Sequence, residues 1–207
     1  MPGRRNIWRY WVRLIPDFML HYSSMTTFFS SFTIERIGDH WQAGNAVVCG
    51  DVAMGVDCSI WFNAVIRGDV APITLGKNVN VQEGAVLHCD HGVPLVIGDD
   101  VTIGHGAVVH CKAVGDGTLI GIKAVVLAGA VIGRKCIVAA GAVVSPGTVV
   151  SDGQVVMGIP AKVVRPVRPA ELVDMQNNNK HYVALAAEHV AQRKKIYQPR
   201  REKQSRH

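Results

Sequence analysis

The chain has 207 residues, enough for one domain with its own core, and 48% of them are hydrophobic although only 6% are aromatic. Its net charge of +6 comes from the ends: residues 1–24 carry four arginines and one aspartate, and residues 193–207 carry seven lysines or arginines and one glutamate. The body between them is mildly acidic, so we expect solvated basic ends and no nucleic-acid partner.

The first 30 residues are interpreted as a basic N-terminal extension. They hold Trp8 and Trp11 among arginines, but neither the apolar region nor the cleavage site of a secretory signal. An over-extended start with Met25 beginning the folded protein, an interfacial helix and a targeting presequence are the alternatives. No run of about 20 apolar residues occurs, so no membrane partner is expected. Five cysteines without disulfide-framework spacing predict a reduced, cytoplasmic protein.

A six-residue period runs through the middle of the chain. Aliphatic residues recur at this spacing, and each follows another aliphatic residue; the series is Ile120, Val126, Ile132, Val138, Val144, Val150 and Val156. An α-helical period of 3.6 cannot produce this pattern. A six-residue unit is one short strand and a turn, and three units return the chain to its starting side.

The repeat therefore predicts a mainly β protein, a triangular parallel β-helix with an aliphatic interior over residues 31–165. Hexapeptide-repeat families, which this pattern resembles, wind left-handed. Pro160 cannot donate a strand hydrogen bond and marks the end of the coils. Residues 166–197 are predicted to form a C-terminal α-helix packed on the prism, broken near residues 177–179, and residues 198–207 a disordered basic tail.

Three histidines, His88, His105 and His110, lie close together in this repeat. Leu87 and Val109 both fall on the aliphatic period but are 22 residues apart, so four extra residues must form a loop within 89–96. His88 and His110 then occupy equivalent positions on successive coils, where strands are about 4.8 Å apart. Two imidazoles at that spacing can converge on one zinc ion.

His105 precedes His110 by five residues, so the two lie near opposite ends of one prism face. Within a single prism His105 cannot easily join the other pair. A symmetric neighbour could supply it, and a metal site of three histidines therefore predicts a cyclic oligomer. The alternative is that each histidine is an ordinary surface or hydrogen-bonded residue.

At this point the chain resembles the gamma-class carbonic anhydrase family. The resemblance covers roughly residues 32–165 and rests on a specific set of motifs: Arg67-Gly68-Asp69, Asn80-Val81-Gln82-Glu83-Gly84, Leu87-His88, Ile103-Gly104-His105, His110 and Gly158-Ile159-Pro160-Ala161-Lys162. It implies a homotrimer with three interfacial metal sites, each with His88 and His110 from one subunit and His105 from its neighbour. The cofactor would be Zn²⁺, and sites of three histidines also accept Fe²⁺ or Co²⁺.

The resemblance also implies roles for other residues. Arg67 and Asp69 would form an interfacial ion pair that supports the site, unless they are an ordinary surface pair. Gln82 and Asn80 would hold the metal-bound water and CO2, unless they are the stacked turn amides common in β-helices. Tyr182 would lie near the metal, although a plain core-facing aromatic is an equal alternative.

Two departures from the family bear on its activity, the hydration of CO2 to bicarbonate. Val70 stands where one proton-relay glutamate is expected, and the acidic loop that carries the other is reduced to the turn 89–94, which offers Asp90 and His91. We therefore expect slow turnover at an otherwise intact metal site. Cys89 and Cys111 follow the two stacked histidines and should point into the core, the alternative being an oxidation-sensitive pair.

Three functions compete. The first is metal-dependent CO2 hydration. The second is acyl transfer or thioester hydrolysis with coenzyme A, an activity of many hexapeptide-repeat proteins. The third is a non-catalytic trimeric accessory protein that keeps the metal site for structure.

Overall fold

The computed structural model describes residues 33–196, with side chains through residue 191. The predicted N-terminal extension and the predicted basic tail lie outside these residues. No helix in the described part of the chain is long and apolar enough to cross a membrane.

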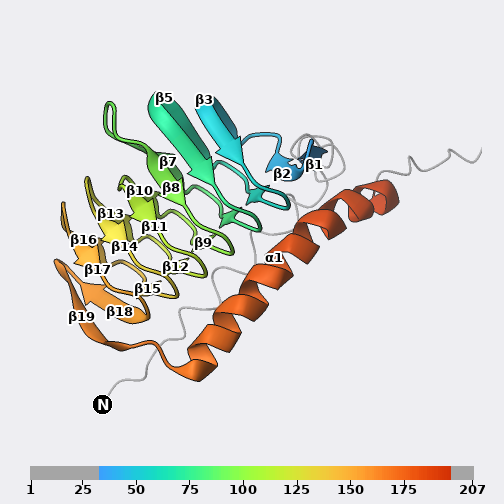
Figure 1. The fold of residues 1–207 in the computed structure, drawn as a ribbon. Helices are drawn as coiled ribbons and strands as arrows, with labels where there is room; N and C mark the ends of the chain where they lie inside the picture. The colour runs from blue at the N-terminus through green and yellow to red at the C-terminus, as the bar shows by residue number, and fades with distance from the viewer. Residues whose placement is uncertain (1–32, 197–207) are drawn as a thin grey trace, which may run out of the picture. The chain divides into compact units, whose positions relative to one another are not determined.

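Short parallel strands form three faces of a coiled β-helix (Figure 1). Face 1 contains β2 (His40–Ala43), β4 (Ser59–Ile60), β6 (Asn80–Val81), β9 (Thr102–Ile103), β12 (Leu119–Ile120), β15 (Ile137–Val138) and β18 (Gln154–Gly158). Face 2 contains the first parts of β3 (Val47–Met54) and β5 (Val65–Leu75), then β7 (Val86–His88), β10 (Val108–Val109), β13 (Val125–Val126) and β16 (Val143–Val144). Face 3 contains the second parts of β3 and β5, then β8 (Leu95–Ile97), β11 (Ala113–Val114), β14 (Val131–Ile132) and β17 (Val149–Val150).

Two antiparallel strands close the ends of face 1. Strand β1 (Ile34–Ile37) pairs with β2, and β19 (Ala161–Pro166) pairs with β18. A single helix, α1 (Pro169–Ile196), follows. The architecture confirms the predicted fold class, a parallel β-helix of six-residue units followed by a C-terminal helix.

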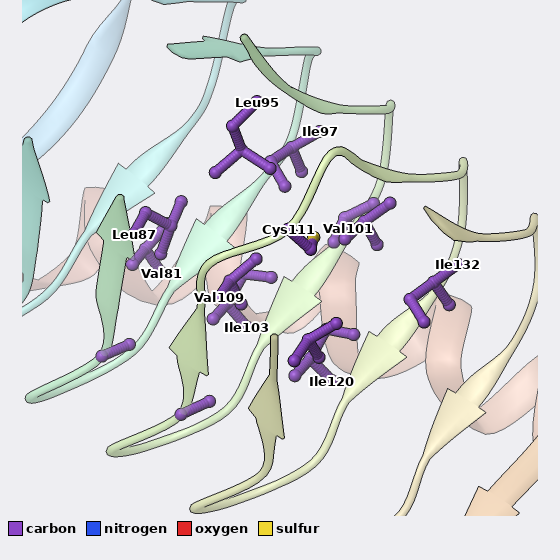
Figure 2. Close-up of a cluster of buried hydrophobic side chains, with 14 of the residues drawn as sticks. Val81, Leu87, Leu95, Ile97, Val101, Ile103, Val109, Cys111, Ile120 and Ile132 are labelled. Carbon is purple, nitrogen blue, oxygen red and sulfur yellow. The ribbon is translucent and has the colours of Figure 1, made fainter. Parts of the chain in front are cut away.

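Each two-residue strand of the coils contributes one aliphatic side chain to the interior, as the six-residue period predicts, and longer strands such as β5 and β8 contribute more. Ile120, Val138 and Val156 stack in register on face 1, and each is at most 2% exposed. Figure 2 shows the same stacking in the earlier coils, where Val81, Ile103 and Leu87 point inward toward Leu95 and Ile97. Burying one such side chain contributes about 1.5–3 kcal/mol, so the repeated unit supplies most of the driving force for coiling.

The corner between faces 2 and 3 absorbs changes in coil length. Leu87 pairs directly with Val109, which confirms the inserted loop before β8. A second insertion was not evident from the sequence: Ile66 pairs with Leu87, 21 residues away, and the three extra residues belong to β5 as it turns this corner. Residues at this corner lie between the paired strands of faces 2 and 3. Extra residues here therefore leave the pairing register of both faces intact.

Helix α1 lies against face 1, where it contacts β1, β4 and β6. Its start is fixed by Arg165, which donates two hydrogen bonds to the Glu171 carboxylate, at 2.8 and 2.7 Å. These bonds, with one from the Arg168 backbone, lower the pKa of Glu171 to about 2.

The predicted break at residues 177–179 is wrong, because α1 is continuous from Pro169 to Ile196. Asn179 is only 3% exposed and donates a 2.7 Å hydrogen bond to the carbonyl oxygen of Asn78, in the turn before β6. A run of asparagines weakens a helix by local propensity alone, and here the tertiary hydrogen bond and the packing of the helix offset that weakness.

Replacing Asn179 with Ala should lower the free energy of unfolding by about 1–3 kcal/mol, because the part-buried Asn78 carbonyl oxygen loses its partner. The matched control is Asn177→Ala on an exposed position of the same helix, which should change stability by no more than about 0.5 kcal/mol. Urea unfolding at fixed protein concentration measures both. Equal stability of the two variants would contradict the anchoring role of Asn179.

Candidate metal centre

His88 and His110 lie one above the other at the corner where face 2 ends. Because Leu87 pairs with Val109, the two histidines follow equivalent positions, and their ring centroids are 5.2 Å apart with the planes at 67°. Their side chains are 17% and 30% exposed in the single chain. The predicted stacking of these two histidines is therefore confirmed.

A carboxylate faces the Nε2 atom of each ring. Asp69 Oδ1 lies 3.2 Å from His88 Nε2, and Asp90 Oδ1 lies 2.9 Å from His110 Nε2. Asp69 is itself held by Arg67, whose Nη1 donates to both carboxylate oxygens at 2.8 and 2.7 Å. These Arg67 bonds, and to a smaller extent His88, lower the pKa of Asp69.

Arg67 and Asp69 thus form their ion pair within one chain, next to the histidine pair, with both side chains 45% exposed. The Asp90 contact was not predicted, although Asp90 was recognised as part of the inserted loop. The sequence feature that could have indicated this contact is the position of Asp90, two residues after His88 in the inserted loop.

His105 occupies the opposite end of face 2, in the turn between β9 and β10. Glycines on both sides shape this turn: Gly106 has a φ of +64°, and a Cβ on Gly104 would lie 2.8 Å from the Ile122 backbone nitrogen of the next coil. Only glycine allows the coils to stack this closely here. The His105 side chain is 43% exposed, and its Nδ1 lies 2.5 Å from Glu83 Oε2.

Asn80 and Gln82 form a buried chain of hydrogen bonds that ends at His105. Asn80 donates to Thr102 Oγ1 at 2.9 Å, Gln82 donates to Asn80 Oδ1 at 3.1 Å, and Gln82 Oε1 accepts the His105 backbone N–H at 3.2 Å. The two amides are 1% and 4% exposed in the single chain. Within one chain the two amides therefore position the His105 turn.

Tyr182 lies on α1 and packs edge-on against Trp61, with ring centroids 5.3 Å apart. It belongs to the small apolar cluster formed by α1, β1, β2 and the residues after β4. Burial raises the pKa of Tyr182, and the charge of Glu83 raises it further. Tyr182 is thus a core-facing aromatic that nevertheless lies within electrostatic reach of the His105 turn.

The cysteines that follow the two stacked histidines point inward. Cys89 and Cys111 are 1% and 3% exposed, and burial raises the pKa of both thiols, that of Cys111 to about 12. Thiols of such high pKa are poor nucleophiles at neutral pH. This placement agrees with their interpretation as small core residues.

The three histidines do not meet within one chain. Among residues 33–196, no group of three or more His, Cys, Asp or Glu side chains is close enough to hold a metal ion. One corner of face 2 supplies two imidazoles that can converge, and the other corner supplies a third that faces away from the prism. The donor set fits a metal site only if a second chain brings its His105 to the His88–His110 corner.

Comparison with known proteins places the chain in a family. A family model described as bacterial transferase hexapeptide (six repeats) matches residues 113–146. A protein from Methanocaldococcus jannaschii named probable carbonic anhydrase is 43% identical over 144 residues, covering 70% of this chain and 91% of that protein. Gamma carbonic anhydrase 2, mitochondrial, from Arabidopsis thaliana is 35% identical, covering 86% of this chain and 66% of that protein.

The fold is also found in solved structures. A hexapeptide transferase family protein from Anaplasma phagocytophilum superposes with a TM-score of 0.70 at 34% identity, covering 74% of this chain and 90% of that one. Transferase-named structures share the fold at 34% and 36% identity, and curated relatives that are 43% and 40% identical over about 70% of this chain carry the carbonic anhydrase name. With these matches extending over the coils that hold the histidines, the chain belongs to the gamma-class carbonic anhydrase family.

Proposed function

We propose that the chain is a metal-dependent carbonic anhydrase that interconverts CO2 and bicarbonate at sites shared between neighbouring chains of a homotrimer. The observation that carries this proposal is the placement of the histidines: His88 and His110 stack at one corner of face 2, and His105 lies at the other. Two imidazoles from one chain and one from the next give the three-nitrogen set of a catalytic zinc site, with a fourth position open.

The outer surface of face 2 supports assembly through this face. Six valines stack there in continuous register between the two histidine corners: Val47, Val65, Val86, Val108, Val125 and Val143. Helix α1 makes its main strand contacts with β1, β4 and β6, on face 1. An outward-facing apolar column of this kind favours burial against another chain, and threefold repetition of the contact would close a ring.

A bound ion, Zn²⁺ or alternatively Fe²⁺ or Co²⁺, would supply the Lewis acidity that makes water nucleophilic near neutral pH. The chain would contribute the ligands His88, His105 and His110, with Arg67 holding the Asp69 carboxylate beside them. One N–H of the Gln82 amide donates to Asn80; we assign the other to hydrogen bonding of substrate, and Asn80 orients that amide.

Proton release is the step for which this chain is poorly equipped. Val70 packs partly against the apolar core at the position of one expected relay glutamate. The loop that should carry the other is the short turn with Asp90 and His91, and Tyr182 lies against Trp61. We therefore propose that the chain is a slow carbonic anhydrase. If it does not hydrate CO2, the alternative is a metal-binding accessory protein without catalytic activity.

Stopped-flow CO2 hydration on the Zn²⁺ and Fe²⁺ forms of the full chain tests the activity. The unaltered protein should bind about one metal ion per chain and hydrate CO2 above the buffer rate. His105→Ala should lose the metal and the activity together, because one of three ligands is removed. The control is His181→Ala, an exposed histidine on α1, which should keep both. A flat trace from the metal-loaded protein would overturn the enzymatic proposal.

Mixing of two inactive variants tests whether the site is shared. His88→Ala and His105→Ala chains co-expressed in equal amounts should form mixed trimers, each with one complete site, and recover about a quarter of the normal metal content on statistical grounds. Co-expression of His88→Ala with His110→Ala should recover none, because both ligands come from the same chain. Metal analysis of purified trimers provides the measurement, and equal content in the two mixtures would contradict a shared site.

A charge placed on the valine column should prevent assembly. Val125→Lys puts an ammonium group in the middle of face 2 and should shift the mass measured by light scattering from trimer to monomer, because a buried unpaired charge is costly. Val131→Lys places the same charge on face 3 of the same prism region and should leave the trimer intact. Identical behaviour of the two variants would show that face 2 is not the interface.

A further inference from the structure

Glu83 is a charged residue that the proposed chemistry leaves without a role. It lies in the turn after β6, directly over the turn that carries His105 in the next coil. The Gly106 backbone N–H donates to the Glu83 carbonyl oxygen at 2.9 Å, and the Lys123 backbone N–H donates to the His105 carbonyl oxygen at 2.9 Å. The His105 backbone is therefore fixed between the coils above and below it.

The side chain of Glu83 lies against the His105 ring. Its Oε2 is shielded from solvent and lies 2.5 Å from His105 Nδ1. This contact does not have hydrogen-bond geometry, but it places a negatively charged oxygen against Nδ1 and not against Nε2. A carboxylate at Nδ1 favours the tautomer that carries its proton there and leaves the Nε2 lone pair free.

The other two histidines are oriented in the opposite way. His88 and His110 turn Nε2 toward Asp69 and Asp90, at 3.2 and 2.9 Å. Among the three, His105 is the one whose Nδ1 faces a carboxylate of the adjacent turn. It is also the one that must reach a neighbouring chain without help from a stacked partner ring.

We propose that Glu83 is a positioning residue: it holds His105 through Nδ1 so that Nε2 is presented to the metal ion bound by His88 and His110 of the neighbouring chain. The inference rests on the metal site of the proposed function, but not on CO2 hydration. Carboxylates that hold the second nitrogen of a ligating histidine typically contribute 10–100-fold to metal affinity, and Glu83 should act within that range.

The test compares Glu83→Ala and Glu83→Gln with Glu188→Ala, which alters an exposed glutamate on α1. Zinc affinity of the trimer, measured by competition with a chromogenic chelator, should fall about 10–100-fold in Glu83→Ala. It should fall less in Glu83→Gln, whose amide oxygen can still accept from Nδ1–H, and should not change in Glu188→Ala. Light scattering on the same samples reports whether the trimer is retained.

A second readout needs neither metal nor activity. Nitrogen-15 spectra of the imidazole groups in the metal-free protein should show His105 with its proton on Nδ1, and Glu83→Ala should lose that tautomer preference. Unchanged affinity and unchanged tautomer in an assembled Glu83→Ala trimer would overturn the proposal, and if that variant fails to assemble, the same comparison on Glu83→Gln decides. A protein that binds zinc in a Glu83-dependent way but does not hydrate CO2 would refute the enzyme and leave the role of Glu83 standing.

Discussion

The hydrogen-bonded register between successive coils is the constraint on which every functional feature of this chain depends. Each strand presents one aliphatic residue inward and its neighbour outward, so a slip of one residue would expose the whole core. Because this burial is repeated in every coil, the register of any one coil is fixed by many others. Residues that point outward from the strands and turns can therefore be polar or charged without disturbing the packing of the core.

The functional side chains lie at the two corners of face 2. At the corner between faces 2 and 3, β5 and the loop before β8 accommodate extra residues, and the same corner holds His88, His110, Asp69 and Asp90. At the corner between faces 1 and 2, tight glycine-containing turns stack without insertions and hold Glu83 over His105. One corner is thus adapted to carry loops and charge, and the other to hold a single ring rigidly.

Helix α1 packs next to the hydrogen-bonded amides that lead to His105. It contacts face 1 at β4 and β6, where the outward residues Ser59, Asn80 and Thr102 are polar and buried. Asn179 binds the turn before β6, two residues ahead of Asn80, which begins the amide chain leading to His105. Face 1 is therefore the face on which the helix packs, and the valine column lies on face 2.

Several features followed from the sequence alone, because they depend on local period and count. The six-residue spacing of Ile120 to Val156 predicted the β-helix, and the 22-residue separation of Leu87 and Val109 predicted both the loop and the stacking of His88 on His110. The family resemblance followed from motifs whose spacing matches these coils. The continuous helix through Asn177–Asn179 did not follow, since helix propensity is weak there and the stabilising partner, Asn78, lies 101 residues away.

The orientation of side chains at the site was likewise decided only by the tertiary structure. Asp90 reaches His110, 20 residues later, and Glu83 reaches His105, 22 residues later, across the gap between coils. Such contacts depend on which corner a side chain occupies and which nitrogen it faces, and neither is encoded in residue spacing. The sequence determined that three histidines share one face; the packing of coils determined that one chain can bring only two of them together.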